Sequence, residues 1–388
     1  MKYYIIAGEA SGDLHGSNLI KALKNKDKDA VIHAWGGDMM ATEGAVLRKH
    51  YRDLAFMGFL EVINNIGTIF RNIAFCKKDI LEFQPDVIIF IDYPGFNLRI
   101  AKWAKQQHFK TFYYISPQIW AWHTSRVHGI KERVDRMFCI LPFEKDFYKQ
   151  FDYDIDFVGH PLLDVVANAP KTTIEEFRQQ NDLDERPIIA LLPGSRKQEI
   201  EKMLSIMLTV QPHFKGYQFV VAAASAQTLS SYDVFLKNTE GVENSENIGK
   251  RIKIVQNQTY ALLQHATAAL VKSGTSTLET ALFGVPEVVC YKGSKFSYSI
   301  AKRVIKVKYI SLVNLIADRE IVKELIQEHL TTENLVRELQ NAIDNQETIK
   351  KDYDILRGLL GNAGASDKTA KLMWQYLNNG QKKPKINV

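Results

Sequence analysis

Short, β-rich apolar segments alternate with segments of helical periodicity along most of this chain. The apolar segments lie at residues 3–7, 30–34, 86–91, 111–115, 136–140, 156–158, 188–192, 218–221, 252–255, 268–271 and 287–291. Because they are apolar nearly throughout, each is expected to be a strand that helices cover on both faces. The alternation therefore predicts an α/β fold built on parallel, doubly wound sheets.

The predicted strands form two groups, which a polar stretch near residues 160–187 separates. A chain of 388 residues is long enough for two domains of ordinary size. We predict one doubly wound domain over residues 1–165 and a second over 186–350, facing each other across a substrate cleft. Apolar spacing of three and four predicts further helices at residues 319–329, 332–344, 347–360 and 367–377. Residues 351–378 are expected to pack on the first domain or on a partner chain, and residues 379–388 to form a tail.

Composition narrows the function classes. The 50 basic and 44 acidic residues give a net charge of +6, which favours anionic partners such as a nucleotide, a phosphorylated substrate or a lipid headgroup. This excess is too small to indicate nucleic-acid binding. The three cysteines are scattered without metal-binding spacing, as in a reduced cytoplasmic protein. No apolar run reaches the roughly 18 residues that cross a bilayer, and the immediate first strand leaves no room for a signal peptide.

The first predicted strand leads directly into a glycine-rich loop, Gly8–Gly16, and then a helical pattern. Glycines let the backbone approach a ligand closely, and a helix N-terminus offers N–H groups to an anion. However, the spacing is not G-x-G-x-x-G, and the loop carries Glu9, Asp13 and His15, which are groups that move protons. We interpret the loop as part of a reaction site, although Asp13 could equally cap the following helix.

Two turns in the second half have features of a nucleotide site. The turn Lys272–Thr277 combines hydroxyls, a glycine and a helix start, which together can hold a diphosphate, and Glu279 can accept hydrogen bonds from ribose hydroxyls. Alternatively, this is a capped helix in which Glu279 completes a capping box. In the turn Pro193–Arg196, Arg196 can grip phosphate oxygens in a bidentate fork, or it can be a surface residue. The predicted nucleotide site comprises Gly194, Ser195, Arg196, Ser273, Gly274, Thr275, Ser276 and Glu279.

Two strands of the first half also end in polar or aromatic residues. Asp92 stands at the carboxyl end of a predicted strand, which is the functional edge of such a sheet. The segment Ser116–Trp122 follows the next strand, and its Trp120 and Trp122 can stack on a sugar or an acyl chain, or anchor the core.

Seven segments in this order resemble the lipid-A-disaccharide synthase family of Gram-negative bacteria (glycosyltransferase family 19). They are residues 8–16, 116–122, 141–144, 158–161, 192–196, 273–275 and 311–315, and the resemblance extends from Tyr3 to about Trp374. It implies a GT-B fold of two Rossmann-like domains. It also implies transfer of 2,3-diacylglucosamine from its UDP derivative to 2,3-diacylglucosamine 1-phosphate, giving a β-1,6 disaccharide 1-phosphate and UDP with inversion. UDP would be held by the predicted nucleotide site together with Asn314, without a metal or other cofactor. Gly12, Ser116, Trp120 and Trp122 would belong to the acceptor side.

The chain departs from the family at one position. Gly95 stands where the family often has an aspartate that is a favoured general base. Inversion requires one general base that takes the proton from the acceptor 6-hydroxyl. Asp92, His15 and Asp13 are nearly equal candidates, with Glu9 as a fourth.

Acylated substrates imply contact with the inner leaflet of the inner membrane from the cytoplasmic side. A one-sided stripe of Ile63, Ile66, Ile69 and Phe70 could serve as an acyl-binding or membrane face, or could be ordinary core. A second stretch, residues 292–308, is rich in lysine and aromatic residues, which suits an anionic leaflet or a solvated face. The resemblance also allows a homodimer.

Two other functions compete with this hypothesis. One is another UDP-sugar enzyme of the same fold, such as an epimerase, which would release UDP without a lipid acceptor. The other is a non-catalytic lipid-binding homologue, for which the only argument is the missing carboxylate at Gly95.

Overall fold

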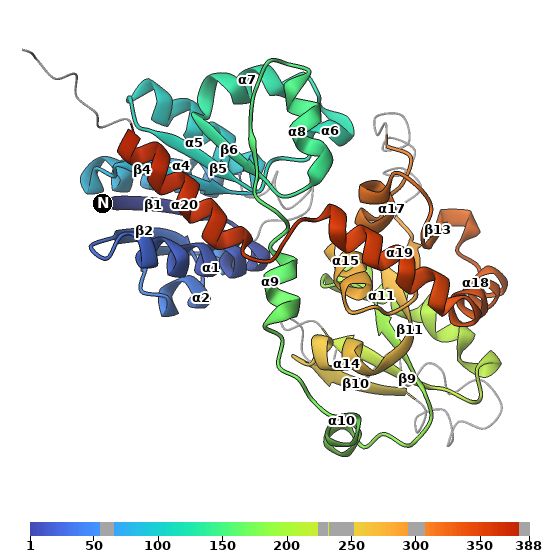
Figure 1. The fold of residues 1–388 in the computed structure, drawn as a ribbon. Helices are drawn as coiled ribbons and strands as arrows, with labels where there is room; N and C mark the ends of the chain where they lie inside the picture. Colours follow the sequence, from blue (N-terminus) through green and yellow to red (C-terminus); the bar gives the residue numbers. More distant parts are fainter. Residues whose placement is uncertain (55–65, 224–231, 233–251, 294–306, 380–388) are drawn as a thin grey trace, which may run out of the picture. The chain divides into compact units, whose positions relative to one another are not determined.

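The computed structural model describes residues 1–54, 66–223, 232, 252–293 and 307–379 (Figure 1). The chain divides into two compact units. The first unit comprises Met1–Asp164 and Leu360–Val388, and the second comprises Val165–Leu359. Helix α9 (Leu162–Ala167) carries the chain from one unit to the other. The predicted break near residues 160–187 includes this point.

The first unit contains a sheet of seven described strands, all parallel, in the order β3-β2-β1-β4-β5-β6-β7. Its strands are β1 (Lys2–Ala7), β2 (Val31–Gly36), β3 (Val46–His50), β4 (Val87–Ile91), β5 (Thr111–Tyr114), β6 (Arg136–Cys139) and β7 (Asp156–Phe157). The sequence order reverses between β1 and β4, where Tyr3 lies opposite Val87 and Ala7 opposite Ile91. Such a reversal is the usual ligand position in an open α/β sheet.

Helices cover both faces of this sheet. One face packs against α4 (Ile66–Phe83), α5 (Pro94–Gln106), α7 (Arg126–Arg133) and α8 (Pro142–Lys149). The other face packs against α1 (Ala10–Lys26) and the C-terminal α20 (Ala365–Asn379), which lies beside α1 in Figure 1. Short helices α2 (Asp38–Thr42) and α6 (Ile119–Trp122) and a 3₁₀ turn (Tyr51–Leu54) complete the described part of the unit.

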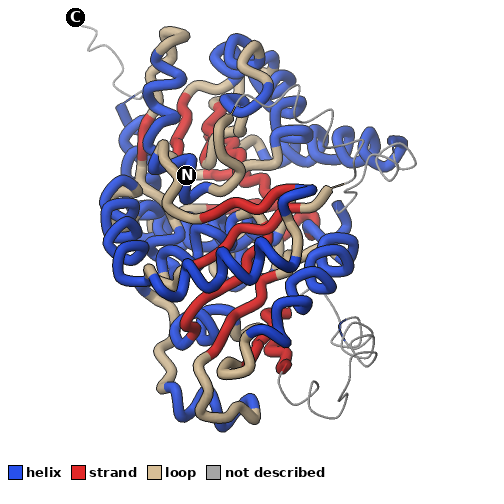
Figure 2. Tube along the Cα trace, turned by 90° about the vertical axis from the view of Figure 1, so that its right-hand side faces the viewer, coloured by secondary structure: helices blue, strands red, loops and turns tan. Residues whose placement is uncertain are grey.

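The second unit repeats this architecture with six described strands, again all parallel, in the order β10-β9-β8-β11-β12-β13. They are β8 (Ile188–Leu192), β9 (Gln218–Ala223), β10 (Ile252–Gln256), β11 (Ala266–Lys272), β12 (Glu287–Tyr291) and β13 (Lys323–Ile326). Its helices are α10 (Ile174–Asn181), α11 (Lys197–Met207), α14 (Thr259–His265), α15 (Thr275–Leu282), α17 (Leu312–Ala317), α18 (Thr332–Asp344) and α19 (Gln346–Leu359), with 3₁₀ turns at Leu208–His213 and Gln327–His329. Figure 2 shows strands in red with helices in blue on either side.

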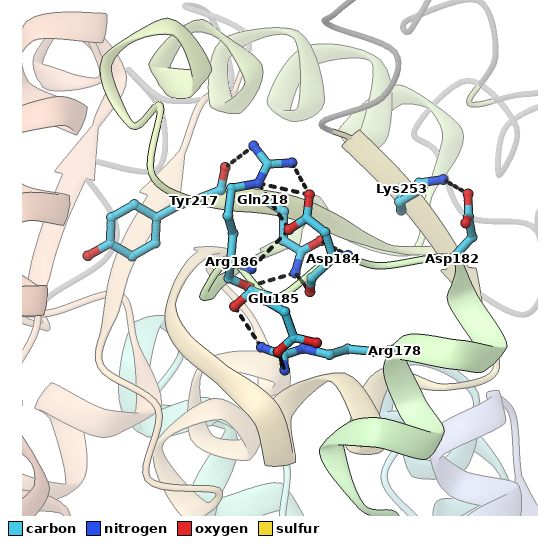
Figure 3. Close-up of polar contacts among 8 residues, drawn as sticks. All are labelled: Arg178, Asp182, Asp184, Glu185, Arg186, Tyr217, Gln218 and Lys253. Atoms are coloured by element: carbon cyan, nitrogen blue, oxygen red, sulfur yellow. Dashed lines mark hydrogen bonds and ion pairs between the residues drawn. The ribbon is translucent and has the colours of Figure 1, made fainter.

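A polar network stabilises the segment that leads into β8 (Figure 3). The Gln218 amide donates to the carbonyl oxygens of Asp184 (2.8 Å) and Arg186 (2.6 Å). The Arg186 guanidinium binds the Asp184 carboxylate and lowers its pKa, and Arg178 donates to the carbonyl of Glu185 at 2.9 Å. These contacts lie at the amino ends of β8 and β9, the edge opposite the predicted nucleotide turns.

The prediction of parallel, doubly wound α/β sheets is confirmed, but some elements differ. The predicted helix at residues 319–329 is wrong, because residues 323–326 form β13 and pair with β12. Pairing at an open sheet edge outweighed the helical spacing. Strand β3 escaped prediction because its residues are mostly half-exposed and not apolar throughout. The predicted segment 351–378 is divided between the units, since α19 ends at Leu359 and α20 begins after Gly361 and Gly364, both at positive φ.

Candidate functional site

Four of the predicted segments lie in pairs at the carboxyl edges of the two sheets, at the reversals of strand order, whereas Ser116–Trp122 follows β5 and Asn314 lies on α17. In the first unit the Gly8–Gly16 segment follows β1, and Asp92 follows the adjacent β4. In the second unit the turn at Gly194 follows β8, and the turn at Ser273 follows the adjacent β11. Parallel neighbours end side by side, so each pair of turns forms one candidate site.

Asp92 is held in an unusual backbone conformation. Asp92 and Tyr93 have φ angles of 44° and 50°, in the left-handed region that side chains other than glycine rarely adopt. The Asp92 carbonyl oxygen accepts hydrogen bonds from the Tyr113 hydroxyl (2.6 Å) and the Asn97 amide (2.7 Å), which hold the turn. The Tyr93 ring lies where a side chain at Gly8 would sit, so the two loops touch only because residue 8 is glycine. Strain of this kind concentrates at functional sites.

The environment of Asp92 raises its basicity. Burial raises the pKa of Asp92 from 3.8 to about 6, and the Glu9 carboxylate adds to the effect. The group is therefore ionised at neutral pH and is a stronger base than an ordinary aspartate.

Asp13 is engaged by the backbone of another helix. It lies within α1, and its carboxylate accepts hydrogen bonds from the N–H groups of Gly37 (2.8 Å), Met40 (3.0 Å) and Met39 (3.2 Å). It thus caps α2, whereas the sequence alternative had it cap its own helix. Nearby Gly12 is buried against Ala7 of β1. Gly12 therefore has a packing role, and the Asp13 carboxylate is occupied by hydrogen bonds from the backbone.

His15 and His160 are both buried and interact electrostatically. Burial lowers the pKa of His15 to about 4 and that of His160 to about 3, and the proximity of His15 contributes to the second shift. His160 Nδ1 accepts a hydrogen bond from the N–H of Leu162 at 3.2 Å. Both rings are neutral at pH 7, and such weakly basic imidazoles accept a proton less readily than Asp92. The separation of 145 positions hid this pair from sequence reasoning.

A buried carboxyl organises the Ser116–Trp122 segment. Glu144, on α8, accepts hydrogen bonds from the Ser116 hydroxyl, the Trp120 indole (3.2 Å) and the N–H of Leu141 (3.0 Å). Burial raises the pKa of Glu144 to about 7. Trp120 is therefore held in place by a hydrogen bond, whereas Trp122 is 48% exposed and the Arg126 guanidinium lies over its ring. Sequence reasoning missed Glu144 as the partner of this segment.

In the second unit, Glu199 joins the two turns. Gly194 has a φ of 108°, and Glu199 occupies the space where a side chain at residue 194 would lie. Glu199 Oε1 lies 3.0 Å from Lys272 Nζ and 3.8 Å from an Arg196 guanidinium nitrogen. Arg196 and Lys272, from the ends of adjacent strands, thus contact the same carboxylate. Lys272 is a functional candidate that the sequence analysis did not single out. Ser195 is exposed on the same turn.

The start of α15 presents backbone to solvent. Its N-cap is Gly274, without a side-chain cap, and Gly274 and Thr275 are exposed. The capping-box alternative for Glu279 is wrong, because the third residue of this helix is Thr277. Glu279 Oε1 instead accepts a hydrogen bond from the Tyr260 hydroxyl at 3.0 Å, and burial raises the pKa of Glu279.

Asn314 has no capacity left for a ligand. Its amide nitrogen donates to the Val322 carbonyl (2.8 Å) and to Glu324 (3.0 Å), and its oxygen accepts from the N–H groups of Ile321 (2.8 Å) and Val322 (3.1 Å). These four bonds use all donors and acceptors of the side chain. Glu324 also accepts from Ser311, and Ser273 donates to the Ile310 carbonyl at 3.0 Å. Asn314 therefore positions the loop beside Ser273, and its predicted contact with the nucleotide has to be replaced by this indirect role.

The predicted membrane face is described in part. Ile63 lies outside the described residues, and Ile66 begins α4. Ile69 is half-buried, whereas Phe70 is 63% exposed. Of the second stretch, residues 294–306 lie outside the described part. None of the described helices is both long and apolar enough to span a bilayer. Among the described residues, no three His, Cys, Asp or Glu side chains gather as a metal site would require.

Comparisons with known proteins identify the family. A sequence model of the family described as lipid-A-disaccharide synthetase matches residues 3–372. The lipid-A-disaccharide synthase of Syntrophus aciditrophicus is 38% identical over 373 residues, covering 94% of this chain and 95% of that protein. The protein of the same name from Psychromonas ingrahamii is 39% identical over 386 residues, covering 97% of each.

Solved structures agree on the fold. A UDP-GlcNAc 2-epimerase from Neisseria meningitidis, bound to UDP-GlcNAc, matches with a TM-score of 0.62 at 12% identity, covering 98% of this chain and 100% of that one. The glycotransferase of kitacinnamycin matches with a TM-score of 0.62 at 12% identity, covering 96% and 98%. At such identities these structures show the two-domain GT-B fold alone. The sequence relatives and the family model show that the chain belongs to the lipid-A-disaccharide synthase family.

Proposed function

We propose that this protein transfers 2,3-diacylglucosamine from its UDP derivative to the 6-hydroxyl of 2,3-diacylglucosamine 1-phosphate, with inversion, releasing UDP. The observation that carries this proposal is the family match over residues 3–372, which includes both strand-edge sites. The products are the β-1,6 disaccharide 1-phosphate of lipid A biosynthesis and UDP.

Asp92 acts as the general base in this proposal. It is partly buried at the strand edge, its pKa is raised to about 6, and its backbone is held by Tyr113 and Asn97. Asp13 is occupied by three backbone N–H groups, and His15 is a weak base with a pKa of about 4. Glu9 tunes Asp92 by raising its pKa. Asp92 thereby compensates for the glycine at position 95.

The second unit binds UDP and stabilises its departure. Negative charge grows on the diphosphate as the glycosidic bond breaks, and the exposed start of α15 can meet it with backbone N–H groups. Arg196 and Lys272 supply positive charge from the adjacent turns, held by Glu199. Glu279 accepts hydrogen bonds from the ribose. These groups suffice without a metal ion or another cofactor.

We also propose that the protein works at the cytoplasmic surface of the inner membrane, because both substrates are acylated. The exposed Phe70 on α4 is the described residue that best supports such a contact.

The test is incubation of the purified protein with both lipid substrates, with mass spectrometry for the disaccharide and a separate assay for UDP. Disaccharide and UDP should form in equal amounts, and only when the acceptor is present. UDP release without acceptor would indicate an epimerase-like reaction. Binding of the lipids without any turnover would indicate the non-catalytic alternative.

A further inference from the structure

A basic groove lies between α5 and α7 of the first unit, outside the residues assigned above. It encloses about 550 Å³, and its cationic lining residues are Arg99, Lys102, Arg126 and Arg133. Residues of α5 and of the segment that leads into and includes α7 line it, so the groove belongs to one unit.

Helical spacing explains how each helix builds its wall. On α5, Gly95, Leu98, Arg99 and Lys102 follow at intervals of three and four, so they share one face. The wall on α7 has the same pattern, with Arg126, Gly129, Ile130 and Arg133. Leu98 and Ile130 are the apolar members of the two walls.

The groove carries uncompensated positive charge. No carboxylate lines it, and within the described part of the chain none of its four cations forms an ion pair. Lys105, one turn further along α5, is by contrast paired with Asp135. Arg126 lies over the exposed Trp122 ring, with 5.3 Å between the guanidinium carbon and the ring centroid. Four cations around one cavity create a positive potential that attracts an anion.

The groove begins at the functional edge of the sheet. Gly95 lines it and lies in the first turn of α5, three positions after Asp92. Apart from its chain neighbours and the backbone of its own helix, no described atom lies within 4 Å of the position that a side chain at residue 95 would take, so this end of the groove is open. An aspartate there would place a negative charge at the mouth of an anion site, whereas glycine places none.

We propose that this groove binds the 1-phosphate of the acceptor while Asp92 takes the proton from its 6-hydroxyl. The inference rests on the proposed function, which supplies an acceptor that carries one phosphate. In the acceptor, the 1-phosphate and the 6-hydroxyl are attached through C1 and C5, the two carbons that flank the ring oxygen. Their short separation matches a phosphate site that begins one helical turn from the base. Arginine recognises phosphate by paired hydrogen bonds, and three of the four cations are arginines. Leu98, which is half-buried on α5, suits the apolar part of a phosphorylated amphiphile, whereas Ile130 is 1% exposed and belongs to the core.

The experiment measures binding of two acceptors in detergent micelles, without donor. One is 2,3-diacylglucosamine 1-phosphate, and the other is the same lipid without phosphate. The variants are Arg99→Gln, Arg126→Gln and Gly95→Asp, with the neutral Gly95→Asn and the nearby Lys131→Gln as controls. Lys131 is exposed on α7 but does not line the groove. Unchanged circular dichroism and melting temperature establish that each variant folds.

We expect wild type to prefer the phosphorylated acceptor. Each arginine variant should weaken its binding by about tenfold, the size of one charged hydrogen-bonding group. Gly95→Asp should weaken it as well. The phosphate-free lipid should bind all variants equally, and both controls should resemble wild type.

Three results would overturn the inference: no preference for the phosphorylated lipid, equal losses for both lipids, or Gly95→Asn behaving like Gly95→Asp. Equal losses together with reduced binding to phosphatidylglycerol vesicles would assign the groove to the membrane surface. Failure of the proposed function is a separate observation, because it means that wild type forms no disaccharide, whatever the binding data show.

Discussion

At Asp92, the buried charge that favours catalysis lowers the stability of the fold. Its pKa rises from 3.8 to about 6 on folding, so the ionised carboxylate at pH 7 opposes folding by roughly 3 kcal/mol. The sign follows from the raised pKa: this cost is absent below about pH 4, grows between pH 4 and 6, and is complete above. Its positive φ adds backbone strain.

We predict that Asp92→Asn lowers kcat by about 10²-fold or more and raises the melting temperature by several degrees. Asparagine removes the buried charge and tolerates positive φ better. Steady-state kinetics and calorimetry at pH 7 measure both effects. In wild type, kcat/KM should fall as the pH drops below about 6, where Asp92 becomes protonated.

Glu9→Gln provides the matched control for this pH dependence. Because the Glu9 charge contributes to the raised pKa of Asp92, removing it should shift the acidic limb of the profile to lower pH. An Asp92→Asn variant with normal turnover, or an unmoved acidic limb in Glu9→Gln, would count against the assignment of the base.

At the scale of the element, β12 contains a buried acid at its first residue. Glu287 is 1% exposed, and both of its carboxylate oxygens lack a hydrogen-bond partner among the described residues. Burial, together with the charge of Glu324, raises the pKa of Glu287 well above its ordinary value. Such burial favours the protonated form in the folded protein, whereas the unfolded form ionises above about pH 4.3.

We predict that wild type loses stability relative to Glu287→Gln as the pH rises. The unfolded state releases a proton that the folded state retains, so the difference should grow by about 1.4 kcal/mol per pH unit above about pH 4.3, until the folded group ionises. Urea unfolding of both proteins at pH 5, 6 and 7 measures it. A difference that is constant across this range contradicts a protonated Glu287.

Helix α4 exposes an aromatic side chain at the candidate membrane face. We predict that Phe70→Ser weakens binding to anionic lipid vesicles by about tenfold or more, because burial of a phenyl ring in the interface contributes about 1.5–3 kcal/mol. Vesicle sedimentation measures the change. Val46→Ser, at an exposed apolar residue of the edge strand β3, is the control and should bind as wild type does. Equal behaviour of the two variants would remove Phe70 from the membrane contact.

At the scale of the whole molecule, the C-terminal segment completes the first unit. Ala370, Met373 and Leu377 of α20 are buried in the cluster that also contains Leu19 and Leu23 of α1. The Tyr376 hydroxyl donates to Asp156 at 3.0 Å. The core of this unit is therefore made by residues from both ends of the sequence.

We predict that Met373→Ala destabilises the first unit by about 2–4 kcal/mol, because it leaves a cavity in a fully buried cluster. Its neighbour Trp374 is 38% exposed, so Trp374→Ala should cost clearly less despite removing a larger side chain. Denaturant unfolding of both variants tests the contrast. Similar losses would mean that α20 does not pack as described.

The sequence was sufficient for the features that depend on local pattern. Apolar runs such as residues 86–91 predict buried parallel strands, because helices on both faces exclude water from the whole strand. The position of a polar turn directly after a predicted strand placed Asp92, Arg196 and Ser273 at the carboxyl ends of strands. Long motifs pointed to the family, which the comparisons confirm.

Three-dimensional packing was needed wherever distant residues share a contact. The choice among Asp92, Asp13 and His15 depends on Gly37 and Met40, whose N–H groups occupy Asp13, and on the burial that lowers the pKa of His15. Strand β13 exists because β12 offers an open edge for pairing, whereas its own spacing favoured a helix. Hydrogen bonds, desolvation and edge pairing act through space, so neighbours in the fold, and not neighbours in the chain, set the chemistry of each of these residues.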